Sequence, residues 1–560
     1  MRRHTRAVLT TVLALASVGA LAACGSSSSS STPSGSSSTS SGAPKTGGSI
    51  TLVMGTAPDS LDPGFGYTTQ AAEPDWLAYT GLVTYAHANG TAGGQTIPGL
   101  ATTLPVISNG GTTYTVTLRP NLVYSDGTKV KASDFIHTVE RAIKIPWGGS
   151  GSFITAVIKG ATEYSKGKSS TITGITADDA TGKIVINLVS PYGAFDNVLA
   201  FPSLGFVPPS APFKNEPNSP PPGVGPYMIT NIVPNQSFDL VKNPKWASMA
   251  IPGIPAGNVN TIHTKISANV DANALSVLNG SADVFDWADT IPGSLLPQAQ
   301  SSGRYQKKVM NSTYYVFMNS HNKPFSSQLA REAVATGLDQ NAMNRLGSGT
   351  LLPGCYFLPP GMIGHPTAAC PYGDPASGGN LAKAKQLVQQ SGMAGTPVTV
   401  WSETRSPRQQ WMTYYTQFLN SIGFKATQKV IADATYFTTI GDLKLHPQTG
   451  FADWNQDFPN PIDFYLLVQK GAILPNNNQN FGEVDDPQIN TESNKLGAVP
   501  TSQLSSIASQ WQSLDEYLAK KVYLAVFGYQ TFPAFTSSRV SQNYVFHPLY
   551  GWDWSSFSLK

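Results

Sequence analysis

Short apolar runs and longer amphipathic stretches alternate along most of this 560-residue chain. Runs rich in Val, Ile, Thr and Tyr, residues that suit the pleated surface of a sheet, predict strands at residues 49–53, 114–118, 183–188, 314–318 and 398–401. Apolar residues at helical spacing predict helices at residues 133–143, 329–337, 381–391, 409–422 and 502–521. Strands and helices mixed in this way, with long connections, favour α/β or α+β layers over a sandwich or a bundle.

Three residues are expected to mark helix ends. Ser133 is the predicted N-cap of the first helix, because a hydroxyl oxygen there can accept a bond from an otherwise unpaired N–H group. Gly392 and Gly423 follow the third and fourth helices, where glycine readily takes up the left-handed conformation that ends a helix.

The N-terminal segment has the pattern of an export signal. Three arginines precede an almost wholly apolar run over residues 7–23. A single transmembrane anchor is the alternative, but the run is short, lacks a stop-transfer flank and ends in small residues. We therefore expect residues 1–23 to be a signal peptide.

The end of that run suggests how the exported chain is anchored. Leu21-Ala22-Ala23-Cys24 resembles the lipobox of bacterial lipoproteins, in which cleavage leaves the cysteine as a lipid-carrying first residue. Residues 25–47 are almost wholly Ser, Gly, Thr and Pro with one charge, a composition that behaves as a flexible tether. The prediction is a body that starts near Gly48 and is held at the outer face of the cytoplasmic membrane by a lipid on Cys24.

Charge argues against nucleic acid as a partner. The chain has 36 basic and 33 acidic residues, and four of the basic but none of the acidic residues lie in the first 47 positions. The remainder is therefore close to neutral, and it has no net basic field to hold phosphates.

Two cysteines remain after Cys24. In an exported chain we expect Cys355 and Cys370 to form a disulfide, because disulfides survive outside the cytoplasm. Closing this loop of about 15 residues contributes about 3 kcal/mol in the chain-entropy model. Metal binding by the pair is the alternative, but no CxxC or neighbouring His set completes a site, and the eight histidines are scattered. We expect neither a metal nor a cofactor.

A Pro-rich segment at residues 208–222 predicts a loop. It leads into Gly223-Val224-Gly225-Pro226-Tyr227, whose two glycines are expected where the backbone needs a positive φ or a close approach to a neighbour.

This glycine motif is one of several short sequence motifs that occur in order over residues 48–560. Together these motifs resemble those of the family 5 extracellular solute-binding proteins of ABC importers, the peptide, dipeptide and nickel group. The most specific phrase runs through LRPN at 118–121, YSDGT at 124–128 and ASDF at 132–135, with Asn121 in place of a usual Gly and Tyr124 in place of a usual Phe. The other matching phrases are GGSITL at 47–52, SLDP at 60–63, GLVTY at 81–85, IPGLA at 97–101, NPKW at 243–246, GSAD at 280–283, YYVFMN at 314–319, REA at 331–333, LPPG at 358–361 and WNQDFPNP at 454–461.

The resemblance implies an α/β, two-lobe, periplasmic-binding-protein-like (type II) fold with ligand enclosed between the lobes. Lobe one is expected at residues 48–308 together with 525–560, with a subdomain inserted at about 76–200, and lobe two at 309–524. Hinge closure around the ligand is the expected motion.

The resemblance also implies site residues. Asp457 occupies the position at which peptide binders of this family hold the α-amino group of the ligand; the alternative is that it braces its own turn, Phe458-Pro459-Asn460-Pro461. Trp454 and Phe458 flank it and are expected either to pack on the ligand or to fill the core. Three further ligand candidates are named on weaker grounds: Asn319, which could instead bond the hinge backbone, Trp401 and Tyr67.

The predicted function is a monomeric receptor that binds a small peptide or similar polar solute and delivers it to the permease subunits of an ABC importer. A sensor that reports ligand occupancy to a membrane partner would carry the same cleft. An exported hydrolase is the third possibility, because Ser165 to Lys168 spells SxxK and residues 541–543 resemble SxN. KTG, however, lies at residues 45–47, before the supposed nucleophile, and no GxSxG elbow occurs. We therefore expect no enzyme activity.

Overall fold

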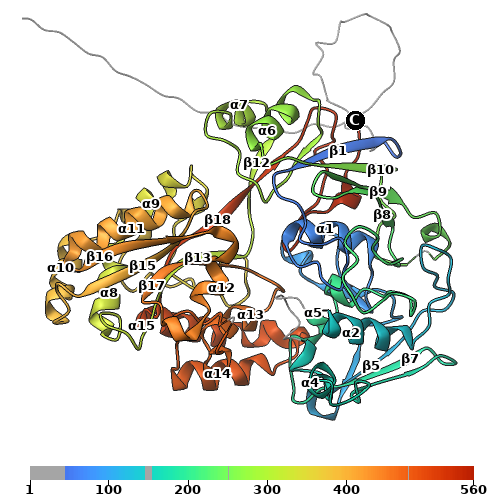
Figure 1. The fold of residues 1–560 in the computed structure, drawn as a ribbon, viewed down its shortest axis with the longest axis horizontal. Coiled ribbons are helices and arrows are strands. Elements are labelled where there is room, and N and C mark those ends of the chain that lie inside the picture. Colours follow the sequence, from blue (N-terminus) through green and yellow to red (C-terminus); the bar gives the residue numbers. More distant parts are fainter. Residues whose placement is uncertain (1–44, 146–153, 250, 477) are drawn as a thin grey trace, which may run out of the picture. The chain divides into compact units, whose positions relative to one another are not determined.

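A computed structural model describes residues 45–145, 154–249, 251–476 and 478–560 (Figure 1). The predicted signal peptide at 1–23, Cys24 and all but the last three residues of the predicted tether at 24–47 lie outside the described residues.

The first lobe is built on a five-stranded sheet with the order β11-β1-β10-β9-β8. Strand β1 runs parallel to β10 and β11, whereas β10, β9 and β8 follow one another antiparallel. Apolar residues of β1 alternate into the core, where Ile50 and Leu52 are almost fully buried. The strands and flanking helices are β1 Ser49–Met54, α1 Thr69–Ala78, β8 Tyr227–Val233, β9 Ser237–Lys242, β10 Thr261–Ile266, α6 Val270–Asn279, β11 Val284–Phe285 and α7 Leu296–Ser301.

A second group of elements in this lobe falls within the interval 76–200 that is expected as an insertion. Its antiparallel sheet has the order β4-β5-β7-β6. A two-stranded ribbon, β2-β3, precedes this sheet in the sequence. The elements are β2 Val83–Tyr85, β3 Thr96–Pro98, β4 Val106–Ser108, β5 Thr113–Thr117, α2 Asp134–Lys144, α4 Ala161–Ser165, β6 Ile175–Asp178, β7 Lys183–Asn187 and α5 Phe195–Val198.

The second lobe is built on a seven-stranded sheet with the order β12-β18-β13-β17-β15-β16, to which β14 adds by pairing with β18. Every residue of the central strand β13 is buried, as expected for a strand covered on both faces. The strands are β12 Tyr305–Val309, β13 Ser312–Met318, β14 Leu351–Leu352, β15 Pro397–Glu403, β16 Lys425–Ile431, β17 Thr449–Asn455 and β18 Leu524–Phe535. The helices are α8 Gln328–Gly337, α9 Gln340–Leu346, α10 Leu381–Gln390, α11 Arg408–Ile422, α12 Tyr436–Ile440, α13 Ile462–Tyr465, α14 Pro487–Gly497 and α15 Ala508–Lys521.

Two segments connect the lobes, one leading into β12 and one leaving β18. Strand β18 extends from the second lobe toward α6 and α7 (Figure 1), and directly after it Thr536 bridges to Val284 of the first sheet. Arg304, just before β12, donates from Nη1 to the carbonyl oxygen of Thr536 at 2.7 Å. The expected boundary at residue 525 therefore falls inside β18, which stays in the second sheet up to Phe535.

Most predicted elements are present with shifted ends, and two local expectations were wrong. Ser133 does not cap α2, because it already has helical backbone angles and its hydroxyl donates to Asp179 instead. The helix expected at 502–521 is a 3₁₀ segment, Thr501–Ile507, followed by α15. Gly423 does end α11, in the left-handed conformation with φ 116°.

The two glycines before Tyr227 are needed for a close approach. A Cβ on Gly223 would lie 2.3 Å from the carbonyl oxygen of Ala78, and one on Gly225 would lie 2.2 Å from that of Leu77. The segment can therefore pass directly against the end of α1, and any side chain at these positions would push it away.

Candidate functional site

A cavity of about 600 Å³ is lined by residues from both lobes. The first lobe contributes residues 66–69, 72, 201–203, 549 and 550. The second lobe contributes residues 315, 405, 408, 437, 438, 453–457, 467, 478, 479 and 481. A cavity of this size lies within the range usual for sites that enclose a small organic ligand.

Asp457 and Tyr67 meet across this cavity. The hydroxyl of Tyr67 donates to both carboxylate oxygens of Asp457, at 2.8 Å to Oδ1 and 3.0 Å to Oδ2. Tyr67 precedes α1 in the first lobe, and Asp457 follows β17 in the second lobe. Both side chains line the cavity, so this carboxylate is available to a ligand that enters it.

The turn that carries Asp457 is braced by another carboxylate. Asp463, fully buried on α13, accepts from the backbone N–H of Asp457 at 2.8 Å and from Nε1 of Trp454 at 3.1 Å. The side chain of Asn460 accepts a bond from the N–H of Ile462 in the same turn. Bracing is thus done by Asp463 and Asn460, while the carboxylate of Asp457 points across the cavity to Tyr67. The sequence did not identify Asp463 as a site residue. The only indication was that a second acidic residue follows the turn.

Removal from bulk water raises the pKa of Asp457 from 3.8 to about 7, against the opposing effect of the bond from Tyr67. Burial, followed by repulsion from Asp457, holds the pKa of Asp463 well above its ordinary range. Two neighbouring carboxyls in a poorly hydrated place resist ionising together. A cation placed beside Asp457 would relieve this repulsion, which is the condition that favours binding of an ammonium group.

One wall of the cavity carries two arginines that differ in their surroundings. Arg408 is held between Glu403 and Asp453, with N–O distances of 2.9 and 2.7 Å, and its guanidinium lies 4.5 Å from the centre of the Phe451 ring. Arg405 is exposed on the cavity wall; among the described residues it has no carboxylate at ion-pair distance, although its charge acts on Asp289 and Asp433 at longer range. Arg408 is therefore neutralised by its own carboxylates, whereas Arg405 has no carboxylate in direct contact among the described residues. Sequence reasoning named neither arginine, and both follow the end of a predicted strand.

The remaining lining is largely apolar. Phe437 and Phe481 stack with their ring centres 6.0 Å apart, and Phe437 keeps 37% of its surface exposed. Other apolar and aromatic members of the lining are Phe201, Tyr315, Leu467, Leu549 and Tyr550. Such surfaces accept apolar groups of a ligand, while the few charged groups fix its orientation.

Three of the six expected ligand residues line the cavity, namely Asp457, Trp454 and Tyr67. The other three do not belong to the lining. Phe458 is fully buried, with its ring centre 6.0 Å from that of Phe201.

Asn319 and Trp401 have structural surroundings of their own. The fully buried amide of Asn319 donates to Oε1 of Glu483 at 2.7 Å, and its side-chain oxygen accepts from the N–H of His321. Trp401 is 5% exposed, with Nζ of Lys429 lying 3.9 Å from its ring centre. Both therefore lie where they stabilise the second lobe.

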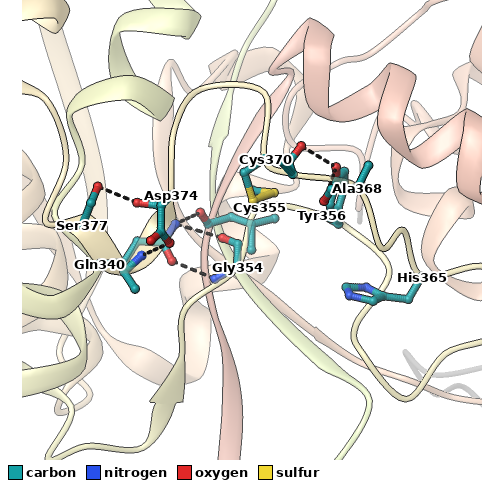
Figure 2. The surroundings of a disulfide bond; sticks show 12 residues. Gln340, Gly354, Cys355, Tyr356, His365, Ala368, Cys370, Asp374 and Ser377 are labelled. Atoms are coloured by element: carbon teal, nitrogen blue, oxygen red, sulfur yellow. Dashed lines mark hydrogen bonds between the residues drawn. A yellow bond between two sulfur atoms is a disulfide. The ribbon is translucent and has the colours of Figure 1, made fainter.

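Cys355 and Cys370 form a disulfide with a Cα–Cα distance of 5.9 Å (Figure 2). Tyr356, beside the first of them, donates from its hydroxyl to the carbonyl oxygens of Ala368 and Ala369, so the loop is also closed by hydrogen bonds. Within the described ranges, no three His, Cys, Asp or Glu side chains are arranged to hold a metal ion. Nor does any described helix have the length and apolar character needed to cross a membrane.

Two α/β lobes that enclose a mixed polar and apolar cavity define a solute-binding protein of the periplasmic-binding-protein type. The model of the bacterial extracellular solute-binding proteins, family 5, matches residues 95–473, and the chain belongs to this family. Its members are solute receptors of ABC importers and not enzymes, in agreement with the predictions from sequence.

Individual relatives are distant. The glutathione-binding protein GsiB of Escherichia coli O1:K1 is 27% identical over 328 residues, which are 57% of this chain and 58% of that protein. The match therefore spans well under two thirds of this curated relative. The same extent and identity are found for GsiB of Shigella dysenteriae.

Solved structures share the fold over nearly the whole chain. The clavulanic acid biosynthesis oligopeptide binding protein 2 has a TM-score of 0.82 at 21% identity, covering 92% of this chain and 96% of the other. DppA from Helicobacter pylori, solved with the peptide STSA, has a TM-score of 0.73 at 20% identity, with 92% and 98% covered. At these identities the likeness establishes the fold.

Proposed function

We propose that this protein is a lipid-anchored extracytoplasmic receptor that binds short peptides with a free α-amino group and delivers them to the permease of an ABC importer. The observation that carries the proposal is the carboxylate of Asp457, which faces a cavity lined by both lobes and is braced from behind by Asp463.

The amino end of the peptide is assigned to Asp457. An ammonium group forms charge-assisted hydrogen bonds with a carboxylate, and these are about twice as strong as bonds between neutral groups. Burial raises the pKa of Asp457 to about 7, so its charged form gains strongly from a cation that replaces lost hydration. Trp454 beside it contributes an apolar face to the same end of the cavity.

The carboxyl end is assigned to Arg405. Its guanidinium is on the cavity wall with no carboxylate at ion-pair distance among the described residues, so a ligand carboxylate can accept two in-plane N–H bonds along one edge of it. The aromatic surface of Phe437 and Phe481 then receives a side chain of the peptide. A ligand with one positive end, one negative end and apolar side chains matches this arrangement.

Relatives support the ligand class without fixing it. The names of GsiB, DppA with its bound peptide and the oligopeptide binding protein all refer to peptides or to glutathione, itself a tripeptide. We extend this class to the present chain. We further propose the lobe limits expected above, except that β12 and β18 up to Phe535 belong to the second lobe, together with a monomeric state and a lipid on Cys24 that keeps the receptor at the membrane surface.

The binding proposal is tested with an equimolar library of unblocked di- to tetrapeptides and its N-acetylated counterpart, analysed by native mass spectrometry. Unblocked peptides should be retained selectively by the wild-type protein. Asp457→Asn, which keeps the shape of the side chain, should weaken binding of the best peptide about tenfold or more.

Asp271→Asn is the matched control, because Asp271 is an exposed residue in the first turn of α6 and does not belong to the cavity lining. Its affinity should equal that of the wild type. Equal retention of acetylated and unblocked peptides would contradict the assignment of Asp457.

Delivery and anchoring need cellular measurements. Deletion of the gene should abolish uptake of the retained peptide, and unchanged uptake would favour the sensor. Cys24→Ala should release the protein from the membrane fraction and abolish incorporation of a labelled fatty acid.

A further inference from the structure

We propose that Tyr67 is an internal competitor for the ligand ammonium: its hydroxyl occupies the carboxylate of Asp457 and must be displaced by a ligand that binds there. This inference rests on the proposed role of Asp457 and extends it to a residue of the opposite lobe.

The geometry places the competitor directly on the oxygens concerned. One hydroxyl lies 2.8 Å from Oδ1 and 3.0 Å from Oδ2 of Asp457, so it lies across the edge of the carboxylate between both oxygens. An ammonium group that approaches from the cavity must take at least one of these two oxygens. Its arrival therefore displaces the phenol or forces it to share.

The backbone that carries Tyr67 is fixed. Asp59 accepts from the N–H of Tyr67 with both carboxylate oxygens, at 3.1 Å each, and from the hydroxyl of Thr68 at 2.9 Å. Gly66 lies against α1, where a Cβ would be 2.8 Å from Oδ2 of Asp75. Displacement is therefore a side-chain rotation about a held backbone.

The relative strength of the two hydrogen-bond donors, the phenol and the ligand group, decides which of them binds the carboxylate of Asp457. The phenol is neutral near pH 7, because an ordinary tyrosine titrates near pH 10. An ammonium adds the attraction between opposite charges to its hydrogen bond and can replace the phenol, whereas an amide or hydroxyl of a ligand would exchange one neutral donor for another with no gain. A blocked amino terminus therefore gains nothing at Asp457 while the phenol is in place.

The same bond links the lobes. Tyr67 belongs to the first lobe and Asp457 to the second, so the bond favours the arrangement in which the cavity is enclosed. Removing the hydroxyl removes both the competitor and this link. Tyr67→Phe should therefore bind an unblocked peptide more tightly and should populate more open arrangements when no peptide is present.

The first measurement is calorimetry with Ala-Ala-Ala and its N-acetyl derivative on the full mature protein, freed of bound ligand by unfolding and refolding. Tyr67→Phe should bind Ala-Ala-Ala about three- to tenfold more tightly than the wild type, since the bond from the phenol to the carboxylate no longer has to be broken. Affinity for the acetylated peptide should rise by a similar or smaller factor, because its amide can then bond the carboxylate that the phenol no longer occupies. Unchanged or weaker binding of Ala-Ala-Ala would overturn the proposal.

The control is Tyr164→Phe, a tyrosine of α4 outside the cavity lining, whose affinities should match the wild type. The second measurement needs no ligand: spin labels on cysteines introduced at the exposed residues Lys168 and Lys385 report the distance between the lobes. The distance distribution of Tyr67→Phe should widen toward longer values, and a distribution identical to that of the wild type would overturn the link.

The two proposals fail in different ways. If the wild type retains no unblocked peptide from the library but the label distances shift, the peptide assignment fails and the Tyr67–Asp457 link stands. If peptides bind but Tyr67→Phe changes neither affinity nor distance, the role of Tyr67 fails and the peptide assignment stands.

Discussion

A Cβ on Gly193 would lie 1.8 Å from the carbonyl oxygen of Val499, closer than any real side chain approaches. Gly193 belongs to the first lobe and Val499 follows α14 in the second, so the two lobes touch here through bare backbone. The N–H of Gly193 donates to the carbonyl oxygen of Gly497 at 2.9 Å, and its own carbonyl accepts from the N–H and the hydroxyl of Thr501. This contact and the Tyr67–Asp457 bond join the lobes at two separate places.

Gly193→Ala should separate the lobes at this contact. The added methyl cannot be accommodated without moving backbone, so we expect a loss of about 1–3 kcal/mol in unfolding free energy, the usual range for overpacking. Peptide affinity should also fall, because the cavity needs both walls. Urea denaturation and calorimetry check the two effects. Gly293→Ala, where a Cβ meets nothing within 4 Å, is the control and should leave affinity unchanged.

Peptide affinity should depend on pH through Asp457. Its pKa in the folded protein is raised to about 7, so below pH 7 the carboxyl is largely protonated and must lose its proton to pair with an ammonium. Affinity should fall by up to about tenfold per pH unit below 7, and it should fall again above about pH 8 as the peptide amine loses its own charge. Titrations between pH 5 and 9 test this.

Asp457→Asn supplies the comparison for that profile. The variant has no carboxyl to titrate at this position, so its weaker affinity should vary little between pH 5 and 7. A wild-type affinity that is constant over the same interval would contradict the assigned role of Asp457 in binding a cation.

Arg408→Met should be strongly destabilising. Arg408 neutralises Glu403, which is fully buried, and Asp453, which is nearly so; burial already raises the pKa of Glu403 to about 7. Leaving both carboxylates without their cation should cost about 3–5 kcal/mol in unfolding free energy, measured by urea denaturation. Adding Glu403→Gln to the variant should recover part of the loss.

The control for Arg408 is Arg345→Met. Arg345 reaches Asp339 at 3.7 Å and keeps 71% of its side chain exposed, so this pair should contribute less than about 1 kcal/mol. Equal losses of unfolding free energy in Arg408→Met and Arg345→Met would contradict the view that burial determines how much an ion pair contributes to stability.

Removing the disulfide should lower stability and spare binding. The bond closes a loop with a sequence separation of 15, for which the chain-entropy model gives about 3 kcal/mol. Cys355→Ala/Cys370→Ala should unfold at a lower temperature, while peptide affinity should stay within about twofold, because neither cysteine lines the ligand cavity. A calorimetric melt measures the loss of stability, and a binding titration of the same sample measures the peptide affinity. A change in affinity greater than tenfold would contradict the conclusion that this loop is separate from the ligand site.

The chemistry of neighbouring residues was enough to predict many of the helices and strands from the sequence. The apolar run near Tyr314 became the central strand β13, and Gly423 ended α11, because burial and backbone conformation depend mainly on the residues themselves. Ser133 shows where this reasoning stops. Its hydroxyl donates to Asp179, 46 positions along the chain, instead of accepting a bond from the first turn of α2.

The sequence by itself determined the family phrases, the alternating elements and the position of Asp457 in its turn. Only the tertiary structure decided that Asp457 meets Tyr67, 390 positions away, that Asp463 braces the turn, and that Asn319 bonds Glu483 rather than lining the cavity. The reason is physical: propensity and turn chemistry act between near neighbours, whereas a cavity wall is assembled from segments that only the packing of two lobes brings together.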